Sequence, residues 1–115
     1  MSATAFNMGA TAGKVLIDMS TGRDLGGTGR EEVMEYSWTA PTKCSVFTFA
    51  NTYSSKDTTA KVVVNGQKID QQVLQRNGLY SNLVAAFTAR SGDSITVYTD
   101  LGRNAQSIYL YAITI

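Results

Sequence analysis

From Glu31 onward the chain alternates between apolar and polar residues with a period of two, and turn residues interrupt this alternation at short intervals. The segment Val33–Trp38, for example, places Met34, Tyr36 and Trp38 on one face and Glu35 and Ser37 on the other. Because successive side chains of a strand point to opposite faces, this alternation predicts half-buried β-strands. Short strands at close spacing are typical of a sandwich or a barrel.

Two further segments follow the same rule. Cys44–Asn51 alternates Phe47 and Phe49 against Cys44, Val46, Thr48 and Ala50. Leu83–Thr88 is expected to carry one apolar face made of Leu83, Ala85 and Phe87. Both segments therefore predict strands with one face toward a core.

The strongest turn signal lies in the middle of the chain. The β-branched segment Thr59–Val64 ends at Asn65-Gly66, a pair that favours a type I′ hairpin, and Gln67–Leu74 follows as the return strand. No window keeps a convincing helical period, and the best candidate for a turn of helix is Asp70–Arg76. Counting the alternating segments gives about eight strands, which predicts an all-β fold, an antiparallel β-sandwich of jelly-roll type.

Residues 1–30 differ from the rest. They are rich in Gly, Ala, Ser and Thr, with one short strand predicted at Lys14–Met19 and a glycine-rich loop at Ser20–Arg30. We therefore divide the chain into an N-terminal arm, residues 1–30, and a jelly-roll sandwich, residues 31–115. A solvated tail has no need of apolar side chains, so we expect those of the arm to attach the domain to a neighbouring surface. The expected attachment residues are Phe6, Met8, Val15 and Ile17.

The last predicted strand, Ser107–Ile115, is apolar on both faces. One face would join the core, and the opposite face carries Tyr109, Tyr111 and Ile113. A sandwich strand normally buries one face only, so the second face must also be covered. Either the arm of the same chain or another subunit would cover it. Contiguous apolar patches usually mark interaction sites, which makes Tyr109, Tyr111 and Ile113 the predicted oligomer interface.

Composition removes several classes of function. With 115 residues and a net charge of +1, the chain fits one domain and lacks the basic field that binding of nucleic acid requires. There is no histidine and a single cysteine, which excludes Ser-His-Asp and Cys-His catalysis, His-ligated metals, cysteine-rich metal clusters and an internal disulfide. Apolar runs are short, and the start at Met1–Thr4 lacks the features of a secretion signal, so we expect no membrane partner and synthesis in a reducing cytoplasm. We also expect no catalytic residue, no metal and no cofactor.

Three features suggest a small ligand or reactivity but have a simpler interpretation. The glycines of Gly22–Gly29 lack the pattern of a phosphate-binding loop and favour a flexible linker. Lys43 would lower the pKa of the Cys44 thiol, but an inert, buried cysteine fits an apolar strand better. Calcium would require carboxylates whose spacing matches no calcium loop, so we interpret these as surface charges: Asp18, Asp24, Glu31 and Glu32.

Two predicted loops combine tyrosine with small polar residues. The candidate ligand-binding residues in them are Tyr53, Ser54, Lys56, Tyr80 and Asn82. Tyrosine beside Ser and Asn offers apolar area and hydrogen bonds at a low entropic cost, which suits recognition. Ordinary loop composition is the other interpretation of the same residues.

Several short motifs resemble small jelly-roll domains of bacteriophage virions. They are a strand end, an aromatic strand, an Asn-Gly hairpin and a late Gly-Asp turn: Tyr36–Pro41, Val46–Phe49, Val62–Gly66 and Ala89–Val97. The Gly-Asp turn and the hydrophobic last strand also resemble the C1q/TNF-like fold. The similarity covers residues 33–115. Lys43 and Cys44 stand where such phage domains often have an Asp-Gly turn, and residues 1–30 have no counterpart.

The resemblance implies a trimeric, non-enzymatic module whose last strand faces a threefold axis. The leading hypothesis is a capsid decoration or cement protein, made in a host bacterial cytoplasm and incorporated into the virion. Its partners would be its own copies and the major capsid protein or another virion protein. The alternative is the receptor- or glycan-binding head of a phage fibre, with a host surface glycan as partner; the length of the chain favours the decoration protein. A small carboxylate-dependent enzyme is the third hypothesis and would need two acids that converge in a pocket.

Overall fold

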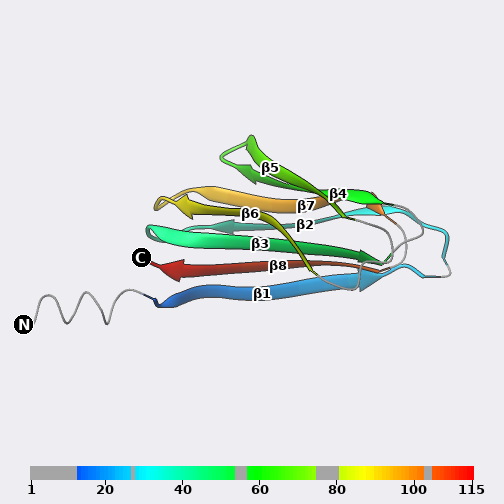
Figure 1. The fold of residues 1–115 in the computed structure, drawn as a ribbon, viewed down its shortest axis with the longest axis horizontal. Coiled ribbons are helices and arrows are strands. Elements are labelled where there is room, and N and C mark those ends of the chain that lie inside the picture. The colour runs from blue at the N-terminus through cyan, green and yellow to red at the C-terminus, as the bar shows by residue number, and fades with distance from the viewer. Residues whose placement is uncertain (1–12, 27, 54–56, 75–80, 103–104) are drawn as a thin grey trace, which may run out of the picture.

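The computed structural model describes residues 13–26, 28–53, 57–74, 81–102 and 105–115. All regular structure in this part of the chain is β-strand, as Figure 1 shows. The strands are β1 (Val15–Asp24), β2 (Glu32–Thr39), β3 (Cys44–Tyr53), β4 (Thr58–Val64), β5 (Gln67–Leu74), β6 (Asn82–Ala89), β7 (Ser94–Gly102) and β8 (Ala105–Thr114). The described residues contain no helix capable of spanning a membrane.

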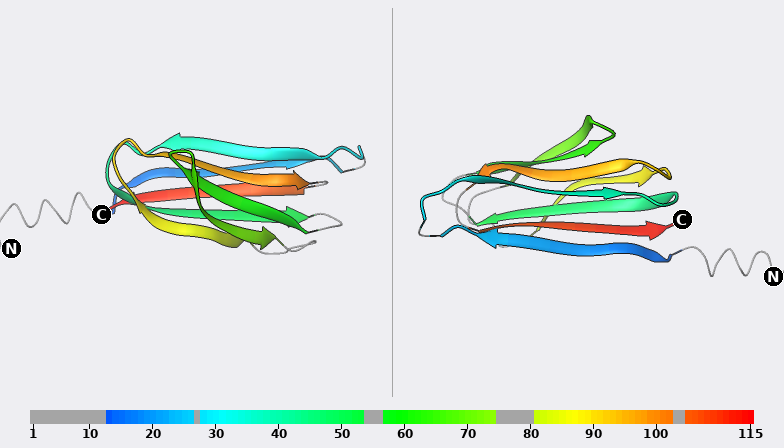
Figure 2. Two further views of the ribbon diagram at one scale, coloured as in Figure 1. Left: turned by 90° about the horizontal axis from the view of Figure 1, so that it is seen from above. Right: turned by 180° about the vertical axis from the view of Figure 1, so that it is seen from behind.

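The described strands form two four-stranded sheets that pack as two layers (Figures 1 and 2). The first sheet has the order β1-β8-β3-β6 and the second has the order β2-β7-β4-β5, with every pair antiparallel. The pairs β4–β5, β3–β6, β2–β7 and β1–β8 are nested, so the chain is one long antiparallel hairpin wrapped onto itself. This is the double-sheet arrangement of a jelly roll, and the predicted fold class is confirmed.

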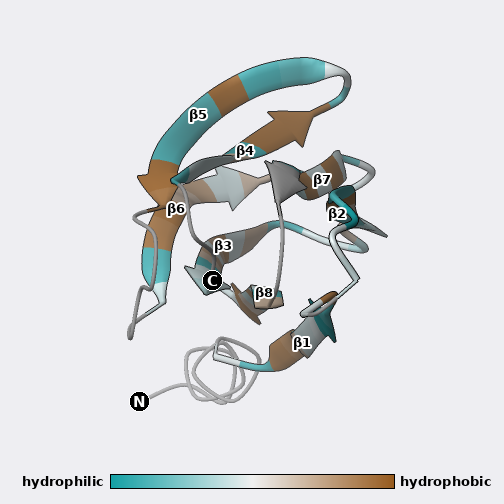
Figure 3. Cartoon of the chain, turned by 90° about the vertical axis from the view of Figure 1, so that its right-hand side faces the viewer, coloured by the Kyte–Doolittle hydropathy of each residue, from teal (hydrophilic) through white to brown (hydrophobic). Residues whose placement is uncertain are grey.

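The tip of the long hairpin is the predicted Asn65-Gly66 turn. Both residues have positive φ, 51° at Asn65 and 82° at Gly66, which is the backbone of a type I′ turn. Figure 3 shows the β4–β5 hairpin arching away from the other strands, with β5 mostly hydrophilic. In β5 only Leu74 is buried. The predicted return strand Gln67–Leu74 is confirmed, and the described residues 70–74 of the best helical candidate are extended because they pair with β4.

The core lies between the two sheets and follows the alternation of the sequence. Every second side chain is buried along Cys44–Thr52 in β3 and along Gln106–Thr114 in β8. The largest fully buried apolar side chains are Val46, Val62, Leu74, Ile95, Val97, Ile108 and Leu110. Met34 is buried, and Tyr36 and Trp38 pack against the core with partial exposure, on the face predicted for all three.

Strand β1 shows that part of the predicted arm belongs to the sandwich. The short strand expected at Lys14–Met19 extends to Asp24 and pairs with β8 along its whole length. The prediction of a loop over Ser20–Arg30 is therefore wrong for its first five residues, Ser20–Asp24. Gly22 shows why a glycine occurs within this strand, because a Cβ at this position would lie 3.3 Å from the carbonyl oxygen of Gln106.

Candidate functional site

The outward side of the first sheet carries a row of aromatic and aliphatic side chains. We call this row the aromatic face, and it consists of Phe47, Phe49, Leu83, Tyr109, Tyr111 and Ile113. Strand alternation points these side chains away from the core. Leu83 is exposed and the others are half-buried, and no described strand lies over them. The three predicted interface residues therefore lie together, on a larger surface than the sequence indicated.

Cross-strand pairing holds the aromatic rings of this face together. Phe47 lies opposite Tyr111 with ring centroids 6.3 Å apart, and Phe49 lies opposite Tyr109 with centroids 5.9 Å apart. The interplanar angles of 47° and 58° are tilted arrangements, which aromatic pairs favour. The alternation of the sequence already placed Phe47 and Phe49 together on one face of their strand. It did not show that β3 and β8 are neighbours, so their part in this face was missed.

A β-bulge in β6 adds Leu83 to the aromatic face. Thr48 lies opposite Ala85 while Phe49 lies opposite Leu83, which leaves Val84 as the extra residue. The buried Thr48 hydroxyl donates to the Ala85 carbonyl oxygen and accepts from the Ala85 N–H, both at 2.9 Å. The prediction that Leu83 and Ala85 share a face is therefore wrong, since Ala85 is buried and Leu83 is 48% exposed.

The charged side chain of Asp18 borders the aromatic face. Asp18 of β1 lies opposite Tyr111, and its carboxylate accepts a hydrogen bond from the Tyr109 hydroxyl at 2.5 Å. This hydrogen bond raises the pKa of Tyr109 above its ordinary value, and burial and the charge of Asp18 act in the same direction. The carboxylate therefore already has a partner within the chain.

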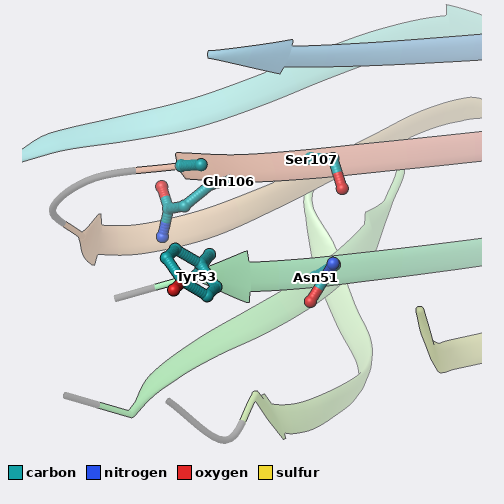
Figure 4. Close-up of a pocket in the computed structure, with 5 residues that line it drawn as sticks. Asn51, Tyr53, Gln106 and Ser107 are labelled. Atoms are coloured by element: carbon teal, nitrogen blue, oxygen red, sulfur yellow. The ribbon is translucent and has the colours of Figure 1, made fainter. Parts of the chain in front are cut away.

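The aromatic face gives way to polar residues where β3 ends and β8 begins. There Asn51 lies opposite Ser107 and Tyr53 lies opposite Ala105. These four residues and Gln106 line a cavity of about 90 Å³, shown in Figure 4. Tyr53 is 56% exposed, whereas the side-chain oxygen of Asn51 is buried and has no hydrogen-bond partner among the described residues.

The core is polar at this end of the sandwich. The side-chain oxygen of Gln106 accepts from Arg23 Nη2 at 2.7 Å and from the Thr99 hydroxyl at 3.2 Å. Arg23 also donates to the backbone oxygens of Glu32 and Val33, so its guanidinium ties β1 to both β2 and β8. The Gln106 oxygen therefore accepts two hydrogen bonds, and its amide nitrogen has no partner in the described part of the chain.

The predicted ligand loops are described only in part. Tyr53 lines the cavity, and Asn82 begins the neighbouring strand β6, where its side chain donates to the Ala50 carbonyl oxygen at 3.4 Å. The remaining candidates lie outside the described residues: Ser54, Lys56 and Tyr80. Sequence reasoning missed the other residues that line the cavity because they lie on strands, although Asn51 and Tyr53 continue the outward alternation of Phe47 and Phe49.

The predicted attachment residues divide in a similar way. Val15 begins β1 and is 48% exposed, whereas Ile17 packs against the hydrophobic core. Phe6 and Met8 lie outside the described residues. Ile17 therefore stabilises the sandwich itself, and the attachment role stays a prediction.

Three motifs that carry the resemblance to phage domains meet at the opposite end of the sandwich. The Ala40 N–H donates to the Asp93 carbonyl oxygen at 2.9 Å, and the Gly92 N–H donates to the Ala40 carbonyl oxygen at 2.8 Å. The Asn65 amide donates to the Asp93 carboxylate at 3.0 Å and accepts from the Ser94 N–H at 2.9 Å. The strand end, the Asn-Gly hairpin and the Gly-Asp turn form one hydrogen-bonded unit, so turn structure explains their residue types.

Cys44 lies at the same end and is fully buried, as predicted. Burial raises the pKa of its thiol, and the nearby charge of Asp93 acts in the same direction. The pKa of Asp93 is lowered by the hydrogen bond from the Arg90 N–H and, to a smaller extent, by the one from Asn65. A thiolate is therefore disfavoured at neutral pH.

The carboxylates considered for calcium do not converge. Asp18 binds Tyr109, and Glu32 forms ion pairs with Arg23 at 3.4 Å and Arg30 at 3.8 Å. Within the described residues, no three carboxylate or cysteine side chains gather as a metal site requires.

Comparison with known proteins yields a likeness of fold only. No protein-family model matches the chain, and no curated protein matches it in sequence. Among solved structures, it is similar to part of a cycloisomaltooligosaccharide glucanotransferase from Paenibacillus sp., complexed with cycloisomaltoheptaose, with a TM-score of 0.42 and 15% identity. The match covers 91% of this chain and 17% of that enzyme, so the chain spans less than a fifth of its length.

Proposed function

We propose that this chain is a non-enzymatic structural protein of a bacteriophage virion, a decoration protein that caps the shell as a homotrimer. The observation that carries the proposal is the aromatic face. It presents contiguous apolar side chains on the outward side of a sheet, where a monomeric protein usually places polar ones.

The composition of the aromatic face suits contact with another subunit. Tyrosine and phenylalanine are enriched at protein interfaces and charged residues are depleted from their centres. The Asp18 carboxylate at its border already accepts a hydrogen bond from Tyr109. Cross-strand pairs hold Phe47 and Phe49 against tyrosines, so these side chains lose little conformational freedom when a partner covers them.

Closed symmetry would limit the number of subunits that associate through the aromatic face. Copies of one chain that use the same surface around an axis form a ring that stops growing. The resemblance to trimeric phage domains favours a threefold axis, with β8 facing it. Attachment to the shell is assigned to the segment before β1, which carries Phe6 and Met8. The lack of histidine supports a role without the common general base.

Assembly is tested on the full chain by sedimentation velocity at micromolar concentration. We expect a trimer for the wild type and a monomer for Tyr111→Asp, because a charge buried in a dry interface costs on the order of 3–5 kcal/mol. The matched control is Tyr98→Asp on the outward side of the second sheet, which should remain trimeric. A monomeric wild type, or a trimeric Tyr111→Asp variant, would contradict the proposed interface.

The virion assignment has its own test. Peptide mass spectrometry of purified phage particles should detect the chain in a fixed ratio to the major capsid protein. If such particles, produced from the genome that encodes the chain, lack it, the decoration role is wrong even when the trimer is found.

A further inference from the structure

The cavity at the end of the aromatic face arises from a change in the size of the cross-strand partner. Phe47 and Phe49 each face a tyrosine, but Tyr53 faces only the methyl group of Ala105. A methyl group covers little of a phenol ring, which agrees with the 56% exposure of Tyr53. Ala105 therefore leaves most of the Tyr53 ring uncovered, next to a cavity of about 90 Å³.

The polar groups around this ring include an acceptor without a donor. The Asn51 side-chain oxygen is shielded from solvent and has no partner in the described chain. A buried polar atom left unpaired costs on the order of 1–3 kcal/mol. Ser107 lies opposite Asn51 and adds a hydroxyl that both donates and accepts. Because solvent does not reach this oxygen, a ligand hydroxyl can donate to it only after the Asn51 amide turns toward the cavity, and that bond would then remove the cost of the unpaired oxygen.

Gln106 lies between Ala105 and Ser107, so its side chain points to the core side of β8, and its unpaired amide nitrogen faces away from the outward side that holds Tyr53 and Asn51. It lines the cavity and is only 3% exposed, and its oxygen is already occupied by donors from Arg23 and Thr99. In the view of Figure 4 its amide nitrogen is turned toward β3 and its oxygen away from β3. The two hydrogen bonds fix this orientation, because an arginine can only donate.

Charge narrows the class of ligand. The lining residues Asn51, Tyr53, Ala105, Gln106 and Ser107 are all neutral, so nothing among them compensates a phosphate, a carboxylate or an ammonium group. A purely apolar ligand would leave the Asn51 oxygen unpaired. We propose that this cavity binds one residue of a neutral saccharide, with the ring of the sugar against Tyr53 and a hydroxyl group donating to Asn51.

The size of the cavity limits how much of the sugar it holds. An apolar cavity that accepts benzene measures about 150 Å³, so a cavity of this size admits one edge of a pyranose and leaves the rest in solvent. We expect a dissociation constant of about 1 mM for a single site. In the proposed homotrimer three sites would act together on a repetitive glycan, which raises the avidity. The site itself does not depend on assembly, since all its residues come from one chain.

The test is a nuclear magnetic resonance titration of the full chain with the methyl glycosides of glucose, galactose and mannose and with N-acetylglucosamine. At least one should shift the amide signals of Asn51, Tyr53 and Ser107 in a saturable way. Tyr53→Ala should weaken this binding about tenfold or more, and Tyr53→Phe should retain it because the ring remains. Asn51→Leu should also weaken it, since leucine cannot accept a hydrogen bond.

Tyr98→Ala is the matched control, because it removes a tyrosine from the outward side of the other sheet. This variant should bind as the wild type does. If none of the four sugars gives saturable shifts, or if Tyr53→Ala binds as tightly as the wild type, the proposal is wrong. Sedimentation of Tyr53→Ala separates the two proposals: loss of sugar binding with an intact trimer concerns the cavity alone.

Discussion

The outward sides of the two sheets follow the same alternation but differ in chemistry. On the second sheet, polar groups satisfy one another across strands. The hydroxyls of Ser37 and Thr96 lie 2.8 Å apart, and Lys61 lies 3.2 Å from the Asp100 carboxylate and 5.7 Å from the centre of the Tyr98 ring. On the first sheet, the corresponding positions hold the aromatic face. On the second sheet these outward polar groups therefore have partners within the chain, whereas the first sheet leaves apolar area for another molecule to cover.

Exposed aliphatic residues on the second sheet do not weaken this contrast. Val33, Ile69 and Val73 are 44–52% exposed, but they lie on β2 and β5, the two edge strands of that sheet. Phe47, Phe49, Tyr109 and Tyr111 instead lie on β3 and β8, the two central strands of the first sheet. Single exposed aliphatic residues are normal on protein surfaces, whereas a contiguous central row indicates an interface.

The first prediction concerns the β-bulge in β6, which turns Leu83 to the outward side of the first sheet. Thr48→Val removes the hydroxyl that bonds both the N–H and the carbonyl of Ala85 inside the bulge. The variant keeps the shape of the side chain but leaves two buried backbone groups unpaired, so the free energy of unfolding should fall by about 1–3 kcal/mol. Chemical denaturation measures this change.

Thr96→Val is its counterpart on the second sheet. Its hydroxyl is partly exposed, so water can replace the lost bond to Ser37 and the free energy of unfolding should change by less than about 0.5 kcal/mol. If the free energy of unfolding fell equally in Thr48→Val and Thr96→Val, the buried Thr48 hydroxyl would contribute no more to stability than the Thr96 hydroxyl at the surface.

Thr48 also shows where prediction from the sequence ends. Alternation and the Asn-Gly turn suffice to predict eight strands and a sandwich, because both signals are local. A bulge shifts the alternation by one residue without leaving a local pattern, so Leu83 was assigned to the wrong face. The hydroxyl that bonds the backbone of the bulge, that of Thr48, lies 37 positions before Ala85 in the sequence.

The same limit applies to the candidate site. The outward position of Tyr109 and Tyr111 could be predicted from their own strand. Their contact with Phe47 and Phe49 depends on which strands are neighbours, and the cavity depends on Ala105 lying opposite Tyr53. Both are consequences of long-range register, which a single sequence does not display.

The second prediction sharpens the comparison by measuring pair energies on both sides. A double-mutant cycle with Phe49→Ala and Tyr109→Ala should give a coupling of about 0.5–1.5 kcal/mol, as expected for a tilted aromatic pair. A cycle with Lys61→Ala and Tyr98→Ala should give at most about 0.5–1 kcal/mol, since the ammonium lies near the outer limit for such contacts and in contact with solvent. Unfolding below the concentration of assembly isolates the pair within one chain. A larger coupling for Lys61 and Tyr98 would reverse the ranking of the two faces.

The last prediction concerns the pH dependence that Asp18 gives to the aromatic face. Its hydrogen bond raises the folded-state pKa of Tyr109 above the ordinary value of 10.0, so the folded chain holds the phenol proton more tightly than the unfolded chain. The resulting stability is fully present below pH 10 and is lost as the pH rises through the folded-state pKa.

Tyr109→Phe lacks this hydroxyl, and its unfolding free energy should therefore fall less steeply than that of the wild type above pH 10. Asp18→Asn removes the charge but keeps an acceptor, and should bring the ultraviolet titration of tyrosinate closer to the ordinary value. Identical alkaline profiles for the wild type and Tyr109→Phe would show that the contact with Asp18 does not persist in solution, and would leave Asp18 as a free charge at the border of the proposed interface.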